Sequence, residues 1–96
     1  MSRTLTVEYE DGRSEEVTVT PMPVSRWDAA WRFTGDSFNE LRLLDLAFNQ
    51  PEGWSKRLAP ASFTAATEVM YEVDKDFFAS VARRQAWRAA MAGSNA

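Results

Sequence analysis

The sequence predicts a single α+β domain over residues 1–96, in which one N-terminal β-hairpin packs on a bundle of three or four α-helices. Three observations lead to this fold class. Apolar residues alternate with polar ones over residues 3–20, which is the period of a β-strand. After residue 24 they recur at steps of three or four, which is the period of an α-helix. A length of 96 residues is enough for one domain and too short for two.

The hairpin is predicted over residues 3–20, with an Asp-Gly turn that ends at Gly12. A two-residue loop would place Val7 opposite a polar side chain. A three-residue loop that ends in a left-handed Gly12 would pair Leu5 with Val17 and keep the apolar side chains on one face. We therefore predict the three-residue loop. Because an isolated hairpin is only marginally stable in water, its apolar face has to pack on the helices.

Two helices are predicted directly after the hairpin. The segment 24–34 begins with Ser25 as its N-cap and ends at Gly35, which would adopt a left-handed conformation. The segment 37–49 begins with a capping box whose N-cap is Ser37. This second helix is apolar around most of its circumference, which indicates the most central helix of a small bundle or one that also meets another chain.

The longest helix is predicted over residues 60–91. One face of it carries a stripe of apolar side chains, namely Phe63, Ala66, Met70, Val73, Phe77 and Val81. A straight helix of this length would extend about 48 Å, whereas a compact domain of this size has a radius of gyration of about 13 Å. We therefore predict that the helix bends near residues 73–76 or that its end, with Trp87, projects beyond the body. Phe78 lies about 100° away from Phe77 around the helix, so it has to cover a second element or await a partner.

The composition argues against catalysis. The chain has no Cys and no His, which removes thiolate nucleophiles, disulfides, the commonest general base and the commonest metal ligand. The four glycines are scattered, so no phosphate-binding loop is indicated. Asp74 and Asp76 would diverge by about 200° on a helix instead of converging on a metal ion. We therefore expect a non-enzymatic protein with no catalytic residue, no cofactor and no bound metal.

The charge and hydropathy pattern bears on partners. No apolar run approaches the ~20 residues that span a bilayer, and residues 1–5 lack the apolar core of a signal peptide, so we expect a cytoplasmic protein with no membrane partner. The net charge of −3 argues against a general nucleic-acid binder. Arg83, Arg84 and Arg88 nevertheless surround Trp87, and such a cluster could meet phosphates and stack a base. The alternative is an ordinary amphipathic helix end with Trp87 packed against the body.

The order of short motifs along the chain adds a resemblance. A strand pair comes first, a Leu-rich helix lies near the middle, and four motifs accompany them: Pro21-Met22-Pro23-Val24, Pro51-Glu52-Gly53-Trp54, Leu58-Ala59-Pro60 and the block from Val73 to Phe78. In this combination the chain resembles the small tail assembly chaperones of long-tailed phages and prophages. It departs from their pattern at Ala59, where Thr or Ser would be the more usual cap, and at Lys75, where Asn or Pro would be more usual.

The resemblance implies a protein of the bacterial host cytoplasm that binds apolar helical surface of the tape-measure protein and helps to recruit tail tube subunits. Reversible coverage of such surface needs exposed aromatic and Met side chains on the binding protein. The candidate partner-binding residues are Trp54, Phe78, Arg83, Arg84, Trp87 and Met91. Two alternatives stay open, a structural virion component of the tail or head–tail region and the small nucleic-acid-binding module. The residues also leave open whether the protein forms a homo-oligomer.

Overall fold

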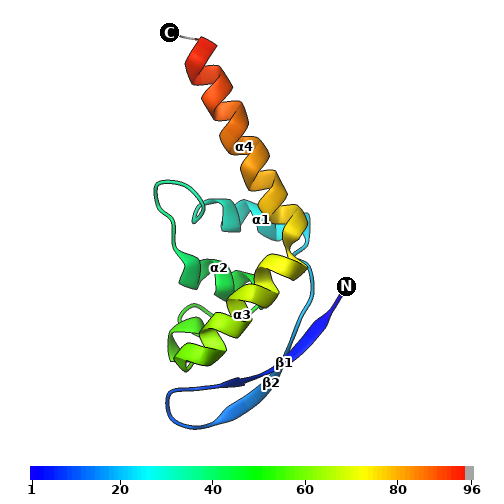
Figure 1. The fold of residues 1–96 in the computed structure, drawn as a ribbon, viewed down its shortest axis with the longest axis vertical. Coiled ribbons are helices and arrows are strands. Elements are labelled where there is room, and N and C mark those ends of the chain that lie inside the picture. The colour runs from blue at the N-terminus through cyan, green and yellow to red at the C-terminus, as the bar shows by residue number, and fades with distance from the viewer. Residues whose placement is uncertain (95–96) are drawn as a thin grey trace.

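The computed structural model describes residues 1–94, so residues 95 and 96 of the predicted domain lie outside the described part. An antiparallel hairpin is followed by four α-helices and a short 3₁₀ helix (Figure 1), and the predicted α+β fold class is confirmed. The elements are β1 (Arg3–Glu8), β2 (Ser14–Val19), α1 (Val24–Trp31), α2 (Glu40–Ala47), η1 (Ser55–Arg57), α3 (Pro60–Val73) and α4 (Lys75–Ser94).

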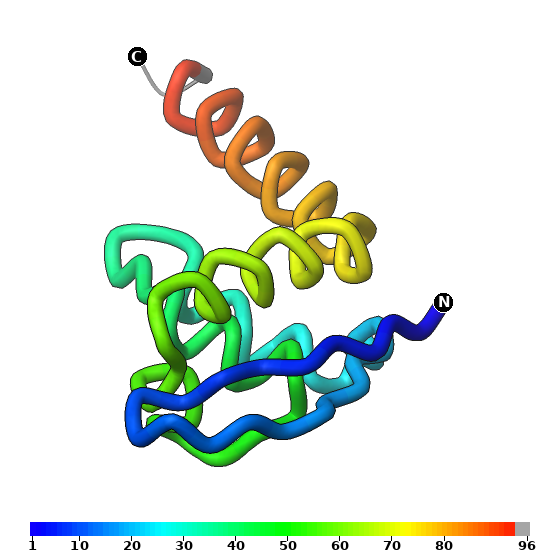
Figure 2. Tube along the Cα trace, turned by 60° about the horizontal axis from the view of Figure 1, so that its bottom comes forward, coloured from blue at the N-terminus to red at the C-terminus, as the bar shows by residue number. Residues whose placement is uncertain are grey.

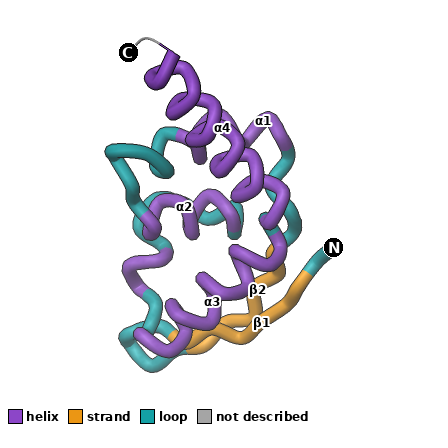
Figure 3. The backbone as a smooth tube through the Cα atoms, turned by 45° about the horizontal axis from the view of Figure 1, so that its top comes forward, coloured by secondary structure: helices purple, strands orange, loops and turns teal. Residues whose placement is uncertain are grey.

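The hairpin has the register that the three-residue loop requires. Leu5 lies opposite Val17, Gly12 has a left-handed φ of 89°, and the Tyr9 N–H donates to the carbonyl of Arg13 at 2.8 Å. This register turns one apolar face of the two strands toward the helices, where α3 packs against β1 (Figure 3). The apolar face of the hairpin is therefore buried against α3, as its stability requires.

The end of β1 is joined to the segment that follows η1. Tyr9 and Leu58 form an isolated antiparallel bridge, and the Ala59 N–H donates to the carbonyl of Glu8 at 2.8 Å. Figure 2 shows the hairpin running beneath the helices, with the connection from α2 to α3 beside its turn. These backbone bonds fix the start of α3 relative to the sheet.

The first helix begins and ends differently from the prediction of 24–34. Its N-cap position is taken by Pro23, whose extended backbone leads into the helix without a side-chain cap, so the assignment of Ser25 as the N-cap is wrong. The helix ends at Trp31, where the hydroxyl of Thr34 donates to the Trp31 carbonyl at 2.8 Å. Because Thr34 satisfies that carbonyl, no left-handed residue is needed, and Gly35 does not have a positive φ.

The second helix is shorter than the predicted 37–49. It begins at Glu40 because the Asn39 side chain accepts a hydrogen bond from the Arg42 N–H at 3.2 Å. The N-cap is therefore Asn39, and the capping box built on Ser37 is wrong. Asn and Ser are about equally good caps, so the path of the chain from α1 decides between them.

The segment predicted as one bent helix over 60–91 consists of two helices, α3 and α4, that meet at Asp74. The Asp74 N–H still donates to the Met70 carbonyl at 2.9 Å, and the Asp74 carbonyl already accepts from the Phe78 N–H at 3.1 Å. The second half of α4 projects away from the other elements (Figure 1). The described chain is consequently elongated, with extents of 54 × 25 × 20 Å.

The core lies between the hairpin, α2, α3 and the first turn of α4. Its largest fully buried apolar side chains come from all of these elements: Val7, Val19, Leu43, Leu44, Met70 and Phe77. The second half of α4 contributes no residue to this core. The fold therefore leaves one end of a long helix outside the packed body.

Candidate functional site

The face of α4 that enters the core continues beyond the body. Phe77 and Ser80 on this face are 1% and 4% exposed, whereas Trp87 and Met91 are 67% and 48% exposed. All four lie close to one stripe of the helix, because they are separated by three, seven and four residues. The apolar face of α4 is therefore covered at its start and open along its second half.

Two Trp side chains of α1 make the contact with α4. The ring of Trp27 meets Phe77 edge to face, with centroids 5.7 Å apart. The indole N–H of Trp31 donates to the Ser80 hydroxyl at 3.3 Å, and the guanidinium of Arg84 lies 4.0 Å over the Trp31 ring. Because α1 and α4 are in contact through these large side chains, their backbones stay apart along the rest of α4.

The position of α1 is fixed from its other side. The indole N–H of Trp27 donates to the carbonyl of Met22 at 3.1 Å. The guanidinium of Arg26 donates to the carbonyl of Leu46 at the end of α2, at 3.2 Å. These bonds hold both Trp side chains of α1 in place in the isolated chain, so the space beside them is preformed.

A groove of about 660 Å³ lies between α1 and α4. We call it the α1–α4 groove, and its lining residues are Val24, Trp27, Trp31, Ser80, Arg83, Arg84, Trp87 and Arg88. Three indoles and a Val supply its apolar surface, and three guanidinium groups supply its charge. No Asp or Glu of the described chain is among the lining residues. The groove thus suits an apolar ligand that also carries negative charge.

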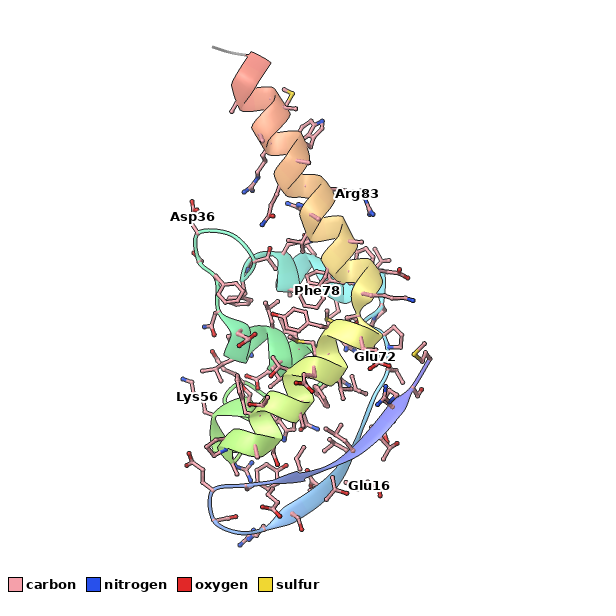
Figure 4. All side chains as sticks on the ribbon, in the orientation of Figure 1. Glu16, Asp36, Lys56, Glu72, Phe78 and Arg83 are labelled. Carbon is pink, nitrogen blue, oxygen red and sulfur yellow. The ribbon has the colours of Figure 1, made fainter. Side chains whose placement is uncertain are left out.

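A smaller polar cavity of about 250 Å³ lies beside the groove, between α4 and the connection from α1 to α2. It shares Trp31, Arg84 and Arg88 with the groove and adds Arg32. Its one carboxylate within the described residues is that of Asp36, at the tip of the connection (Figure 4). Figure 4 also shows Arg83 on the opposite side of α4 from this connection, so cations flank the groove on two sides.

Among residues 1–94, the arginines around the groove have no acidic partner. The ion pairs of residues 1–94 involve arginines of β1, the hairpin loop and α2. Arg32, Arg83 and Arg88 take part in none of them, and neither does Arg84, whose guanidinium lies over the Trp31 ring. Their positive charge is therefore available to a ligand.

The predicted partner-binding residues divide into two groups. Arg83, Arg84 and Trp87 line the α1–α4 groove, and Met91 follows Trp87 by one helical turn on the same face of α4. Phe78 does not line the groove. It is half-buried, with its ring centroid 5.1 Å from that of Phe77 and 4.5 Å from that of Tyr71. Phe78, one of the candidate partner-binding residues, therefore covers a second element and does not belong to the groove.

Trp54 lies inside the body, so its assignment to a partner surface is also wrong. It is 4% exposed, its indole N–H donates to the Tyr9 hydroxyl at 2.9 Å, and its ring packs on Phe48 with centroids 5.2 Å apart. The cause is Asp45, a buried carboxylate of α2. It accepts hydrogen bonds from the backbone N–H groups that flank Trp54, that of Gly53 at 2.9 Å and that of Ser55 at 2.8 Å.

The sequence prediction missed the α1 side of the groove. Val24, Trp27 and Trp31 share a helical face in the sequence, and that spacing is equally typical of a core stripe. Val24 is 68% exposed, and the two indoles are half-buried. Periodicity identifies a face but not what covers it, so only the placement of α1 beside α4 distinguishes a groove from a core.

One further buried carboxylate lies away from the groove. Asp74, at the bend between α3 and α4, is 2% exposed, and its Oδ1 accepts from the Met22 N–H at 2.7 Å. Its Oδ2 has no hydrogen-bond partner among the described residues. Burial raises the pKa of Asp74, and the Met22 N–H and the positive charge of Arg26 oppose that shift in part. This carboxyl group fixes the bend and does not face the α1–α4 groove.

Within residues 1–94, no group of His, Cys, Asp or Glu side chains is arranged to hold a metal ion. None of the described helices is both long enough and apolar enough to cross a membrane. Comparisons of the chain with protein-family models, with curated proteins and with solved structures found no match.

Proposed function

We propose that this protein is a non-enzymatic binding protein that receives an α-helix of another protein in the α1–α4 groove. The observation that carries the proposal is the change along one face of α4, from a buried Phe77 to a Trp87 that is 67% exposed beside a concave apolar surface. Large aromatic side chains at the rim of an apolar hollow are typical anchors for a protein partner. An exposed apolar patch on a small domain also tends to mark such an interaction site.

The shape of the groove favours a helix as the occupant. The groove follows α4 from Ser80 to Arg88, which corresponds to about 12 Å along the helix axis. When a helix packs on two others, its axis usually lies about 8–10 Å from theirs, and side chains from its successive turns fill a space of this kind. The backbone groups of α1 and α4 are hydrogen-bonded within their own helices, so an added β-strand would find no edge to pair with.

On the basis of the resemblance, we propose more specifically that the protein is a tail assembly chaperone of a phage or prophage and acts in the cytoplasm of the bacterial host. Such a chaperone would cover apolar helical surface of the tape-measure protein reversibly and help to recruit tail tube subunits. The groove supports this role because it offers apolar contact area without a reactive group.

A nucleic-acid-binding module is the second candidate, and it is favoured by the three arginines around the exposed Trp87. The net charge of −3 disfavours it. Retention of DNA or RNA that falls steeply with rising salt concentration would support this candidate.

Co-expression with the tape-measure protein of the same phage or prophage tests the leading proposal. The wild-type chain should raise the soluble fraction of the tape-measure protein, and Trp87→Ser should abolish most of that increase. Phe38→Ser is the matched control, because Phe38 is 60% exposed and lines neither the groove nor the polar cavity. Equal solubility with wild type and Trp87→Ser, with both variants folded by circular dichroism, would refute the proposal.

A further inference from the structure

We infer that the helix bound in the α1–α4 groove is acidic, with carboxylates on both sides of its apolar stripe, and that the arginines around the groove select it. This inference rests on the proposed function and specifies the chemistry of the partner. Three features of the groove lining support it. The apolar floor is formed by Val24 and the three indoles, arginines lie on both sides of it, and no described carboxylate is among the lining residues.

The cations have a defined arrangement along α4. Arg84 and Arg88 are four residues apart and therefore lie one above the other on the flank that borders the polar cavity. Arg83 lines the groove but not that cavity, and it lies on the other flank (Figure 4). A helix that inserts its apolar stripe between these flanks brings its own flanking residues next to guanidinium groups on each side.

The guanidinium groups can form charge-assisted hydrogen bonds without first breaking an ion pair within the described part of the chain. The Arg84 guanidinium lies 4.0 Å over the Trp31 ring, a cation–π contact that occupies none of its N–H groups with a carboxylate of the described residues. Arg32 and Arg88 both border the polar cavity, so a carboxylate that extends past the apolar floor would meet them there. Guanidinium and carboxylate groups match in geometry and can pair through two parallel hydrogen bonds.

Charge complementarity also argues against the α4 helix of a second copy as the occupant. After Asp76, α4 carries three arginines and no acidic residue, so two α4 helices packed on each other would bring like charges together. A nucleic acid would match the cations, but it would leave the apolar surface of Val24 and Trp27 without a matching contact. A separate, acidic amphipathic helix satisfies both parts of the groove.

Fluorescence anisotropy with two labelled peptides tests the inference on the full chain. Each peptide has about 18 residues, or five helical turns, with Leu at steps of three and four; one has Glu on both sides of the Leu stripe, and its twin has Lys at the same positions. We expect the Glu peptide to bind at least about tenfold more tightly than the Lys peptide at low salt, with a preference that shrinks as salt rises. Arg83→Gln and Arg88→Gln should each weaken binding of the Glu peptide about two- to fivefold.

Arg13→Gln is the matched control, because it removes the same charge from the hairpin loop, where Arg13 pairs with Asp11. Equal binding of the two peptides would overturn the inference about charge and leave helix binding in place. Failure of both peptides to bind would overturn the inference, and the co-expression test then decides the proposed function separately. Tighter binding of a labelled oligothymidylate of about 15 nucleotides would assign the groove to nucleic acid instead. Self-association in sedimentation that Trp87→Ser abolishes would assign it to a second copy.

Discussion

Replacement of Phe77 by Ala should unfold or strongly destabilise the protein. Phe77 is 1% exposed, and its ring packs against those of Trp27 and Phe78 at 5.7 and 5.1 Å. Removal of a buried Phe side chain costs about 3–5 kcal/mol, because the transfer free energy is lost and a cavity remains. A domain of this size has a total stability of about 5–15 kcal/mol, so the melting temperature should fall by at least about 12 °C.

Trp87→Ala, ten residues further along the same helix face, should change the free energy of unfolding by less than about 0.5 kcal/mol, because the ring is 67% exposed. Urea unfolding followed by far-ultraviolet circular dichroism measures both variants without relying on Trp fluorescence. The dependence of the unfolding free energy on urea should stay the same if only stability changes. A Phe77→Ala protein as stable as wild type, or a loss above about 2 kcal/mol in Trp87→Ala, would refute the division of α4 into a core half and an open half.

Three other predictions concern positions outside the groove. Burial raises the pKa of Asp74 in the folded state above the ordinary value of 3.8, so the wild type should gain stability relative to Asp74→Asn as pH falls from that raised pKa to about 3.8. A difference in unfolding free energy between the two proteins that stays constant with pH would contradict the burial. Asp45→Ala leaves the N–H groups of Gly53 and Ser55 without their acceptor and should cost about 2–5 kcal/mol. An unchanged melting temperature would mean that the turn does not depend on this carboxylate. Gly12→Ala should cost about 1 kcal/mol in the same assay, because the left-handed φ of 89° disfavours a Cβ although no atom lies within 4 Å of it; an unchanged stability would argue against this turn.

The hairpin could be predicted in detail because local rules determine it. Alternation places Leu5 and Val17 on the same face, and a left-handed Gly12 permits the loop that pairs them. The bend between α3 and α4 followed from a different argument, since a straight helix over 60–91 is too long for a compact body. The structure has both a bend at Asp74 and a projecting end, which were offered as alternatives.

The helix caps and the fate of Trp54 could not be predicted, because tertiary contacts decide them. Ser37 and Asn39 are comparable caps in the sequence, and the path of the chain from α1 selects Asn39. Trp54 follows the segment Pro51-Glu52-Gly53, whose composition is typical of an exposed turn. The buried Asp45 of α2 binds the backbone on both sides of Trp54 and holds it against the body.

The candidate site was predicted in part for a related reason. The sequence identifies Trp87 and the positive end of α4 as candidates, but it leaves open whether Trp87 is exposed or packed against the body. The other wall of the groove belongs to α1, whose Trp27 and Trp31 are separated from α4 by more than 40 residues. Their proximity to α4 depends on long-range packing, which no periodicity encodes.

Photo-crosslinking from position 87 during co-expression with the tape-measure protein tests the central claim most directly. A photoreactive benzoylphenylalanine is placed at Trp87, and in a matched chain at Phe38, which is exposed to a similar extent outside the groove. Our account predicts an adduct with the tape-measure protein from position 87 and none from position 38. No adduct from position 87, or equal adducts from both positions, would contradict the claim that the groove between α1 and α4 holds the partner.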